Sequence, residues 1–158
     1  MVRDASFRDA DPRPIALRAE DAEDLRIMSA LVQDAVLTGA DIRHDARQRR
    51  LALLINRFRW EDADQARAEG RPFERVRALL VVNDVLGLQS DGIARDEATV
   101  LELLALEWLP GADGTGRLSL SFAGDGTLMA EVECINLDLR DMTRPYVAPS
   151  GRAPAHPD

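Results

Sequence analysis

Residues 50–61 of the chain read Arg50-Leu51-Ala52-Leu53-Leu54-Ile55-Asn56-Arg57-Phe58-Arg59-Trp60-Glu61. This is the longest strand-like run in the sequence, and it ends in the densest mixture of arginine and aromatic residues. Strict alternation places Leu51, Leu53 and Ile55 on one face of a β-strand, which predicts that this face is buried.

The second half of the stretch does not continue this pattern. Arg57 and Arg59 fall on the same face as the leucines, whereas Phe58 and Trp60 fall in the opposite phase. Either the strand is buried on both sides at its start, or an extra residue near Asn56 shifts the phase. We expect a β-bulge at Asn56–Arg57, because bulges re-aim side chains at strand ends.

Length and composition restrict the class of protein. A chain of 158 residues fits one domain, and only 4% of its residues are aromatic, so the core is expected to consist of Leu, Val, Ile and Ala. No apolar run approaches the ~20 residues of a membrane helix, and the charged first residues contain no secretory signal. The single cysteine, Cys134, excludes an intramolecular disulfide and a multi-cysteine metal site. A cytoplasmic protein without membrane association is expected.

Charge is distributed unevenly along the chain. All 20 basic residues are arginine, and the net charge is −8. Residues 41–77 hold 10 arginines against 7 acids, whereas residues 78–158 hold 5 against 13. The overall acidity makes nucleic acid an unlikely partner, because non-specific binding needs a cationic face. RNA binding through the arginine-rich middle is the weakest of the hypotheses considered.

Periodicity predicts one helix and six to seven strands. Leu25, Met28, Leu31, Val32 and Ala35 form one apolar helical face, preceded by acidic residues that include the expected cap Asp21. Alternating or apolar runs predict strands at about residues 14–18, 36–44, 50–60, 75–82, 99–109, 117–122 and 128–139, with a helix as the alternative for 99–109. Residues 61–72 are expected to be an exposed loop that could include one helical turn, and residues 83–93 a turn-rich segment.

These elements predict an α+β domain. One N-terminal amphipathic helix would pack on a strongly curved, mostly antiparallel sheet or small barrel of six to seven strands. A barrel like the pleckstrin-homology superfold is one version, although the helix of that fold is C-terminal. The expected boundaries are a flexible N-terminus at 1–12, a single domain at 13–142 and a disordered proline-rich tail at 143–158.

Four strings in the chain resemble an uncharacterised protein family, a domain of unknown function found mainly in alphaproteobacteria. They are Glu20-Asp21-Ala22-Glu23-Asp24-Leu25, Ser29-Ala30-Leu31-Val32-Gln33-Asp34-Ala35-Val36, Asn56-Arg57-Phe58-Arg59-Trp60-Glu61, and Phe122-Ala123-Gly124 with Val132-Glu133-Cys134. The resemblance covers about residues 15–142 and implies a bacterial cytoplasmic protein. It implies no activity, ligand or site.

The strongest candidate for a binding site is the cluster Arg57, Phe58, Arg59 and Trp60. Two guanidinium groups beside two aromatic rings could hold a phosphate or carboxylate and stack on a ring. In the structural alternative, Phe58 and Trp60 close the core while the arginines pair with nearby acids such as Glu61. Gln33 and Asp34, at the end of the predicted helix, either face the same partner or form a solvated edge.

Catalytic and metal-binding patterns are weak. Glu131 and Glu133 share one strand face and could serve acid–base or metal chemistry, although a solvated strand face produces the same pattern. His44 has no neighbouring residues at zinc-ligand spacing, so neither a metal nor a cofactor is expected.

The leading hypothesis is therefore a non-enzymatic binding or adaptor module for a protein partner or an anionic ligand. The alternative is an enzyme on a small metabolite that uses Glu131 and Glu133. An exposed edge strand would also be compatible with a homodimer.

Overall fold

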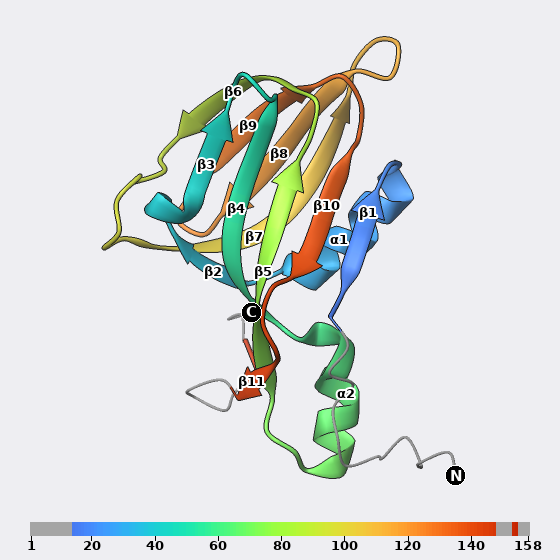
Figure 1. The fold of residues 1–158 in the computed structure, drawn as a ribbon, viewed down its shortest axis with the longest axis vertical. Coiled ribbons are helices and arrows are strands. Elements are labelled where there is room, and N and C mark those ends of the chain that lie inside the picture. The colour runs from blue at the N-terminus through green and yellow to red at the C-terminus, as the bar shows by residue number, and fades with distance from the viewer. Residues whose placement is uncertain (1–13, 148–152, 155–158) are drawn as a thin grey trace.

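The computed structural model describes residues 14–147 and 153–154, and within them an open antiparallel sheet of eleven strands dominates (Figure 1). Two α-helices accompany the sheet, together with a short 3-10 helix, η1. The elements, in chain order, are β1 (Ala16–Ala19), α1 (Ala22–Val32), β2 (Ala35–Thr38), η1 (Gly39–Asp41), β3 (Ile42–Asp45), β4 (Arg50–Phe58), α2 (Trp60–Glu69), β5 (Glu74–Val82), β6 (Val85–Asp91), β7 (Val100–Pro110), β8 (Gly116–Phe122), β9 (Thr127–Val132), β10 (Leu137–Asp141) and β11 (Tyr146–Val147).

The predicted fold class was wrong. The sheet has eleven strands instead of six or seven, and it does not close into a barrel, so neither the small barrel nor the pleckstrin-homology arrangement applies. The first helix follows a strand, and a second helix occupies residues 60–69, where a loop was predicted. Strand β6 likewise replaces a predicted loop.

The strand order is β1-β10-β5-β4-β2-β7-β8-β9-β6, with β3 beside β4 and β11 beside β5. The sheet bends between its two halves, so that the buried side chains of β4 and β5 and those of β8 and β9 belong to a single core. Aliphatic residues make up nearly all of this core, which is the composition expected for a chain with few aromatic residues.

Helix α1 covers one side of that core. Asp21 caps it by accepting a hydrogen bond of 2.7 Å from the amide of Asp24, which confirms the predicted cap. Its buried residues are Leu25, Met28 and Val32, and the Ser29 hydroxyl oxygen accepts a hydrogen bond from the amide of Leu106 on β7. The helix therefore packs on the sheet through the predicted apolar face.

No bulge interrupts β4. Its register with β5 is continuous from Leu51 to Phe58, so the predicted bulge at Asn56–Arg57 was wrong. Alternation simply continues, and Arg57 takes the next inward position after Ile55. Register shifts occur instead in β7–β8, at Leu103/Ala105, and in β6–β9, at Val85/Gly87.

The predicted tail at 143–158 contains one described strand, because β11 pairs with the start of β5. Residues 1–12, predicted to be a flexible N-terminus, lie outside the described residues.

Candidate functional site

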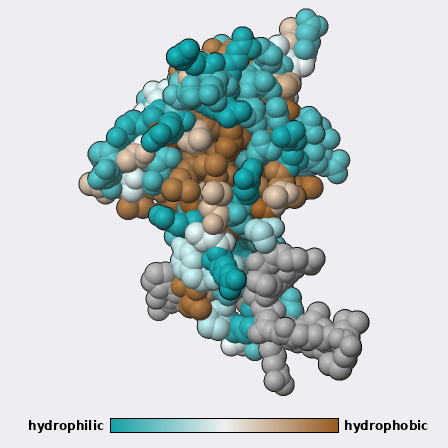
Figure 2. Space-filling model, viewed as in Figure 1, coloured by the Kyte–Doolittle hydropathy of each residue, from teal (hydrophilic) through white to brown (hydrophobic). Residues whose placement is uncertain are grey.

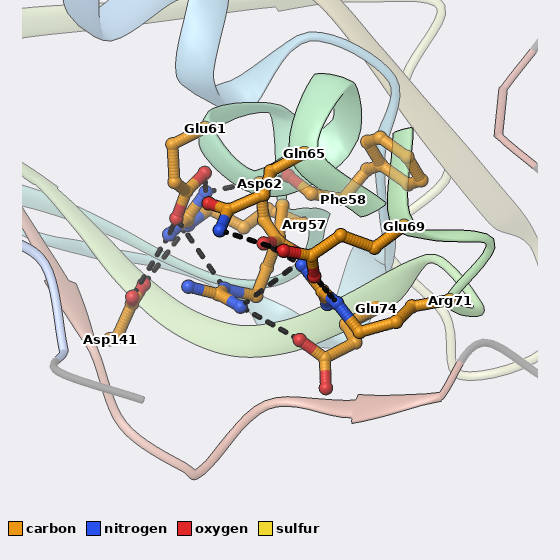
Figure 3. A network of polar contacts seen from close by, with 10 residues as sticks. Arg57, Phe58, Glu61, Asp62, Gln65, Glu69, Arg71, Glu74 and Asp141 are labelled. Carbon is orange, nitrogen blue, oxygen red and sulfur yellow. Dashed lines mark hydrogen bonds and ion pairs between the residues drawn. The ribbon is translucent and has the colours of Figure 1, made fainter. Parts of the chain in front are cut away.

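Among the described residues, Arg57 is the largest fully buried side chain, and it carries a permanent charge. It lies where β4 leaves the aliphatic core, and its guanidinium group is enclosed by carboxylates (Figure 3). Nε and Nη2 donate to the two carboxylate oxygens of Asp141 on β10 at 3.0 and 2.9 Å. Nη1 and Nη2 donate to Glu61 on α2 at 2.9 and 2.7 Å. Two bidentate pairs therefore use the geometry of the guanidinium fork.

These contacts determine the protonation states of Arg57 and Glu61. Burial alone would lower the pKa of Arg57, but the hydrogen bonds that it donates to Glu61 and Asp141 outweigh this effect and hold that pKa above its ordinary value. Burial alone would raise the pKa of Glu61, whereas the hydrogen bond and charge of Arg57 hold it below its ordinary value. Both groups are therefore ionised at neutral pH.

Arg59 and Arg71 extend this network along α2. Arg59 is 4% exposed and contacts Glu74 at 2.7 Å, and it also lies within ion-pair distance of Glu61 and Asp62. Arg71 pairs with Asp62 at 3.0 Å and with Glu69. We call the whole set the α2 network: Arg57, Arg59, Glu61, Asp62, Glu69, Arg71, Glu74 and Asp141. Five carboxylates against three arginines give it a negative net charge.

The aromatic residues of the cluster close the structure around α2. Phe58 is fully buried, and its ring centre lies 4.6 Å from that of Trp60 and 5.6 Å from that of Phe73. Trp60 Nε1 donates a hydrogen bond of 2.9 Å to the backbone oxygen of Gln33. The structure thus brings Trp60 and Gln33 together, as the sequence analysis had grouped them.

Asp34, the other candidate residue after helix α1, is buried near Arg75. It is 1% exposed and has a left-handed backbone with φ of 65°. It lies close enough to Arg75 for its charge to act on that guanidinium group. Burial lowers the pKa of Arg75, and the negative charges of Asp34 and Glu102 partly oppose that shift. Arg75 also donates a hydrogen bond of 3.0 Å to the backbone oxygen of Asn56.

The two glutamates of the alternative site do not form a metal-binding cluster in the described part of the chain. Glu131 lies on β9 opposite Arg117 of β8, and Glu133 forms an exposed ion pair with Arg49. Within residues 14–147 and 153–154, no group of three His, Cys, Asp or Glu side chains is placed to hold a metal ion. In the same residues, no helix has the length and apolar character needed to cross a membrane.

A second candidate surface lies on the side of β4 and β5 that faces away from the core. Their outward residues Ala52, Leu54, Leu79 and Val81 are half-buried and adjacent, because Ala52 pairs with Val81 and Leu54 with Leu79. Figure 2 shows the resulting hydrophobic patch in the middle of the molecule, surrounded by hydrophilic residues. We call this patch and its border the outer face.

Arginine side chains border the patch. In register with it, Arg140 of β10 lies opposite Leu79, and Arg43 of β3 lies opposite Ala52. Arg18, Arg50 and Arg77 complete the border, on β1, β4 and β5. In the part of the chain that the structure describes, the side chains of Arg43, Arg77 and Arg140 form no hydrogen bond or ion pair.

Part of this face is hollowed. A depression of about 670 Å³ is lined by Ala52, Leu79 and Val81, and its border includes Arg18, Arg50 and Arg140. Three carboxylates lie at one end, of which Asp138 pairs with Arg18 at 3.1 Å; the others are Asp45 and Asp84. Five arginines against three carboxylates leave the outer face positive in a protein of net charge −8.

Sequence reasoning missed this surface for a simple reason. Alternation shows which residues of one strand point outward, but the border comes from five strands. Residues such as Arg18 and Arg140 are separated by more than a hundred positions and meet only because β1 pairs with β10.

Comparison with known proteins gives a family and nothing more specific. The family model described as "Protein of unknown function (DUF2948)" matches residues 15–156, so the chain belongs to that family. No curated protein and no solved structure matches the chain.

Proposed function

We propose that this member of the DUF2948 family is a non-enzymatic binding module, and that an acidic protein partner docks on its outer face. One observation carries the proposal: five arginines surround four adjacent aliphatic side chains on an otherwise acidic molecule. An apolar centre with a charged border is the usual anatomy of a protein interface, and arginine is enriched there.

The chemistry of the outer face favours protein over other anionic ligands. Its floor is aliphatic and offers no aromatic ring on which a nucleobase could stack. A long polyanion would also be repelled by the remaining acidic surface. The depression is about half open to solvent, whereas small-molecule sites enclose most of the ligand. A partner surface with apolar side chains and carboxylates fits both the floor and the border.

The proposal gives Arg57 and Arg59 a supporting role. Their guanidinium groups are buried and already engaged by carboxylates, so a ligand would have to displace Asp141 or Glu74 to reach them. Breaking such a buried pair is costly. The α2 network therefore holds α2 and β10 in place, beside the surface that binds.

A cytoplasmic location in a bacterium is part of the proposal. Cys134 is a free, exposed thiol, which is typical of proteins from reducing compartments.

The test is affinity capture followed by reconstitution. Tagged wild-type protein and the variant Arg43→Ala/Arg140→Ala would capture partners from native lysate, and a captured acidic protein would be purified and its affinity measured. The matched control is Arg26→Ala/Arg117→Ala, which removes two arginines that lie outside the outer face, on α1 and β8. We expect loss of affinity only in the outer-face variant. A purified partner that binds all three forms equally would contradict the proposal.

A further inference from the structure

We infer that the partner contributes a single amphipathic α-helix, with an apolar stripe flanked by aspartate or glutamate on both sides, that lies across the outer face. This inference rests on the proposed function and specifies the form of the partner. It follows from the width of the apolar strip, the placement of the arginines and the backbone hydrogen bonds of the strands that carry them.

The apolar strip has the width of one helix. Its four side chains come from the neighbouring strands β4 and β5. Arginines lie on both sides of it, with Arg18 and Arg140 on β1 and β10, and Arg43 on β3. From β1 to β3 the sheet spans four strand intervals, or about 19 Å. A helix with its side chains is about 10–12 Å wide, which leaves room for an arginine on each flank.

The backbone of the outer face excludes an added strand. β5 is hydrogen-bonded to β10 and β4, and β4 is hydrogen-bonded to β5 on one side and to β3 and β2 on the other. Strand addition needs a free sheet edge, and these strands offer none at the patch. An extended segment on the patch would leave its own amide and carbonyl groups unpaired against aliphatic side chains, at a cost in free energy.

A helix avoids this cost because its backbone hydrogen bonds are internal. Helices are also the usual cover for an apolar sheet face. Here α1 packs on the core side of the sheet, through Leu25, Met28 and Val32, and does not cover the outer face. Among the described residues, the outer face therefore carries no helical layer of the kind that usually covers an apolar sheet face.

The border determines the charge of the incoming helix. Arg43, Arg77 and Arg140 have no carboxylate partner in the described residues, so acidic flanks would supply one to each side of the strip. The acids lie toward one end of the face: Asp138 is beside Val81, in register with it, and Asp45 and Asp84 lie beyond that end of the strip. The helix is therefore expected to have its basic residues, if any, near that end.

The experiment uses designed peptides of ~20 residues, long enough for a helix of about 30 Å. The first peptide has a leucine stripe flanked by glutamate. The second has the same stripe flanked by lysine, and the third equals the first except for two prolines on its polar side. Chemical shifts of the ¹⁵N-labelled full chain would be followed during titration, with Arg43→Ala/Arg140→Ala and Arg26→Ala/Arg117→Ala as the protein variants.

We expect the first peptide to shift the amide resonances of β4, β5 and β10, and the lysine peptide to shift none of them. The proline peptide is expected to bind at least about a hundred-fold more weakly, the factor that matches the cost of a single proline inside a helix. The Arg43→Ala/Arg140→Ala variant is expected to bind the first peptide about three- to ten-fold more weakly, and the control variant to bind it like the wild type.

Two results would overturn the inference in different ways. Equal binding of the glutamate peptide and its proline form, at the same residues, would leave an acid-binding face but exclude a helix. If neither glutamate peptide shifts residues of the outer face, both the helix and the proposed function fail.

Discussion

Arg57 and Asp141 lie 84 residues apart in the chain and form a buried bidentate pair, with nitrogen–oxygen distances of 3.0 and 2.9 Å. The pair joins the end of β4 to the end of β10, with 0% and 3% of the two side chains exposed. Because the pair is out of water, each charge depends on the other for its solvation. This dependence makes the pair a sensitive point of the fold.

Replacement of Arg57 is expected to destabilise the protein strongly. Arg57→Met leaves the Asp141 carboxylate buried without its cation, so the free energy of unfolding should fall by about 3–5 kcal/mol. Urea denaturation followed by circular dichroism would measure it. The control is Arg67→Met on the exposed side of α2, where the pair with Asp64 is solvated and the change should stay within ~1 kcal/mol. Equal effects of the two substitutions would contradict the structural role of Arg57.

The contribution of Glu61 is expected to depend on pH. The pKa of Glu61 in the folded protein lies below its unfolded value of about 4.3, so its contribution is complete above that value and is lost as pH falls through the folded pKa. Wild type should therefore be more stable than Glu61→Gln at pH 7, and the difference should shrink below about pH 4. Thermal denaturation across this range would show it. A difference that grows on acidification would have the wrong sign.

Gly39 is expected to tolerate no side chain. A Cβ at this position would lie 1.7 Å from the backbone oxygen of Ala94 and 2.6 Å from Cα of Arg95, so the backbone must move. Gly39→Ala should cost about 1–3 kcal/mol, the range for overpacking. Gly87→Ala is the matched control, since its nearest neighbour is a Glu131 oxygen at 3.8 Å. Comparison of urea midpoints tests this, and a neutral Gly39→Ala would mean that residues 94–95 yield easily.

Variants of the outer face are expected to separate binding from stability. Arg43→Ala/Arg140→Ala removes exposed side chains without partners in the described residues, so the free energy of unfolding should change by less than ~1 kcal/mol. Its affinity for an acidic partner should fall while its thermal midpoint stays near that of wild type. A large loss of stability would instead assign these arginines to the fold.

Alternation predicted the positions of several strands. It did not predict how many strands the sheet has or that the sheet stays open. Strands β5, β7, β8 and β9 were expected near their observed positions, because their residues alternate or are continuously apolar. The pattern carries no information on strand order, so the open path of eleven strands could not be obtained from it.

Helix α2 was missed because it lacks an apolar face. Only two alanines, Ala63 and Ala66, and one acid, Asp62, are buried on it. The helix instead depends on Gly70, which ends it in a left-handed conformation, and on ion pairs with Arg57 of β4 and with Arg71, which follows the helix. Charged residues so close in sequence are equally compatible with a solvated loop, so their pattern alone does not predict a helix.

Arg57 is a second case in which a local pattern was not enough. Strict alternation placed its side chain inward, and the structure agrees, but the opposite phase of Phe58 and Trp60 had favoured a bulge. Only the position of Asp141, fixed by the pairing of β10 with β5, explains how a guanidinium group can occupy that place.

The pairing of β1 with β10 also affects how the chain matures on the ribosome. β1 has β10 as its neighbour in the sheet, and Ala16 lies opposite Arg140. A nascent chain that ends before residue 137 leaves β1 without a neighbour and Arg57 without Asp141. Contacts of such long sequence separation form late and slow folding. The domain should therefore reach its native state only after β10 has been synthesised, and chains that end before β10 should be good substrates for proteolysis.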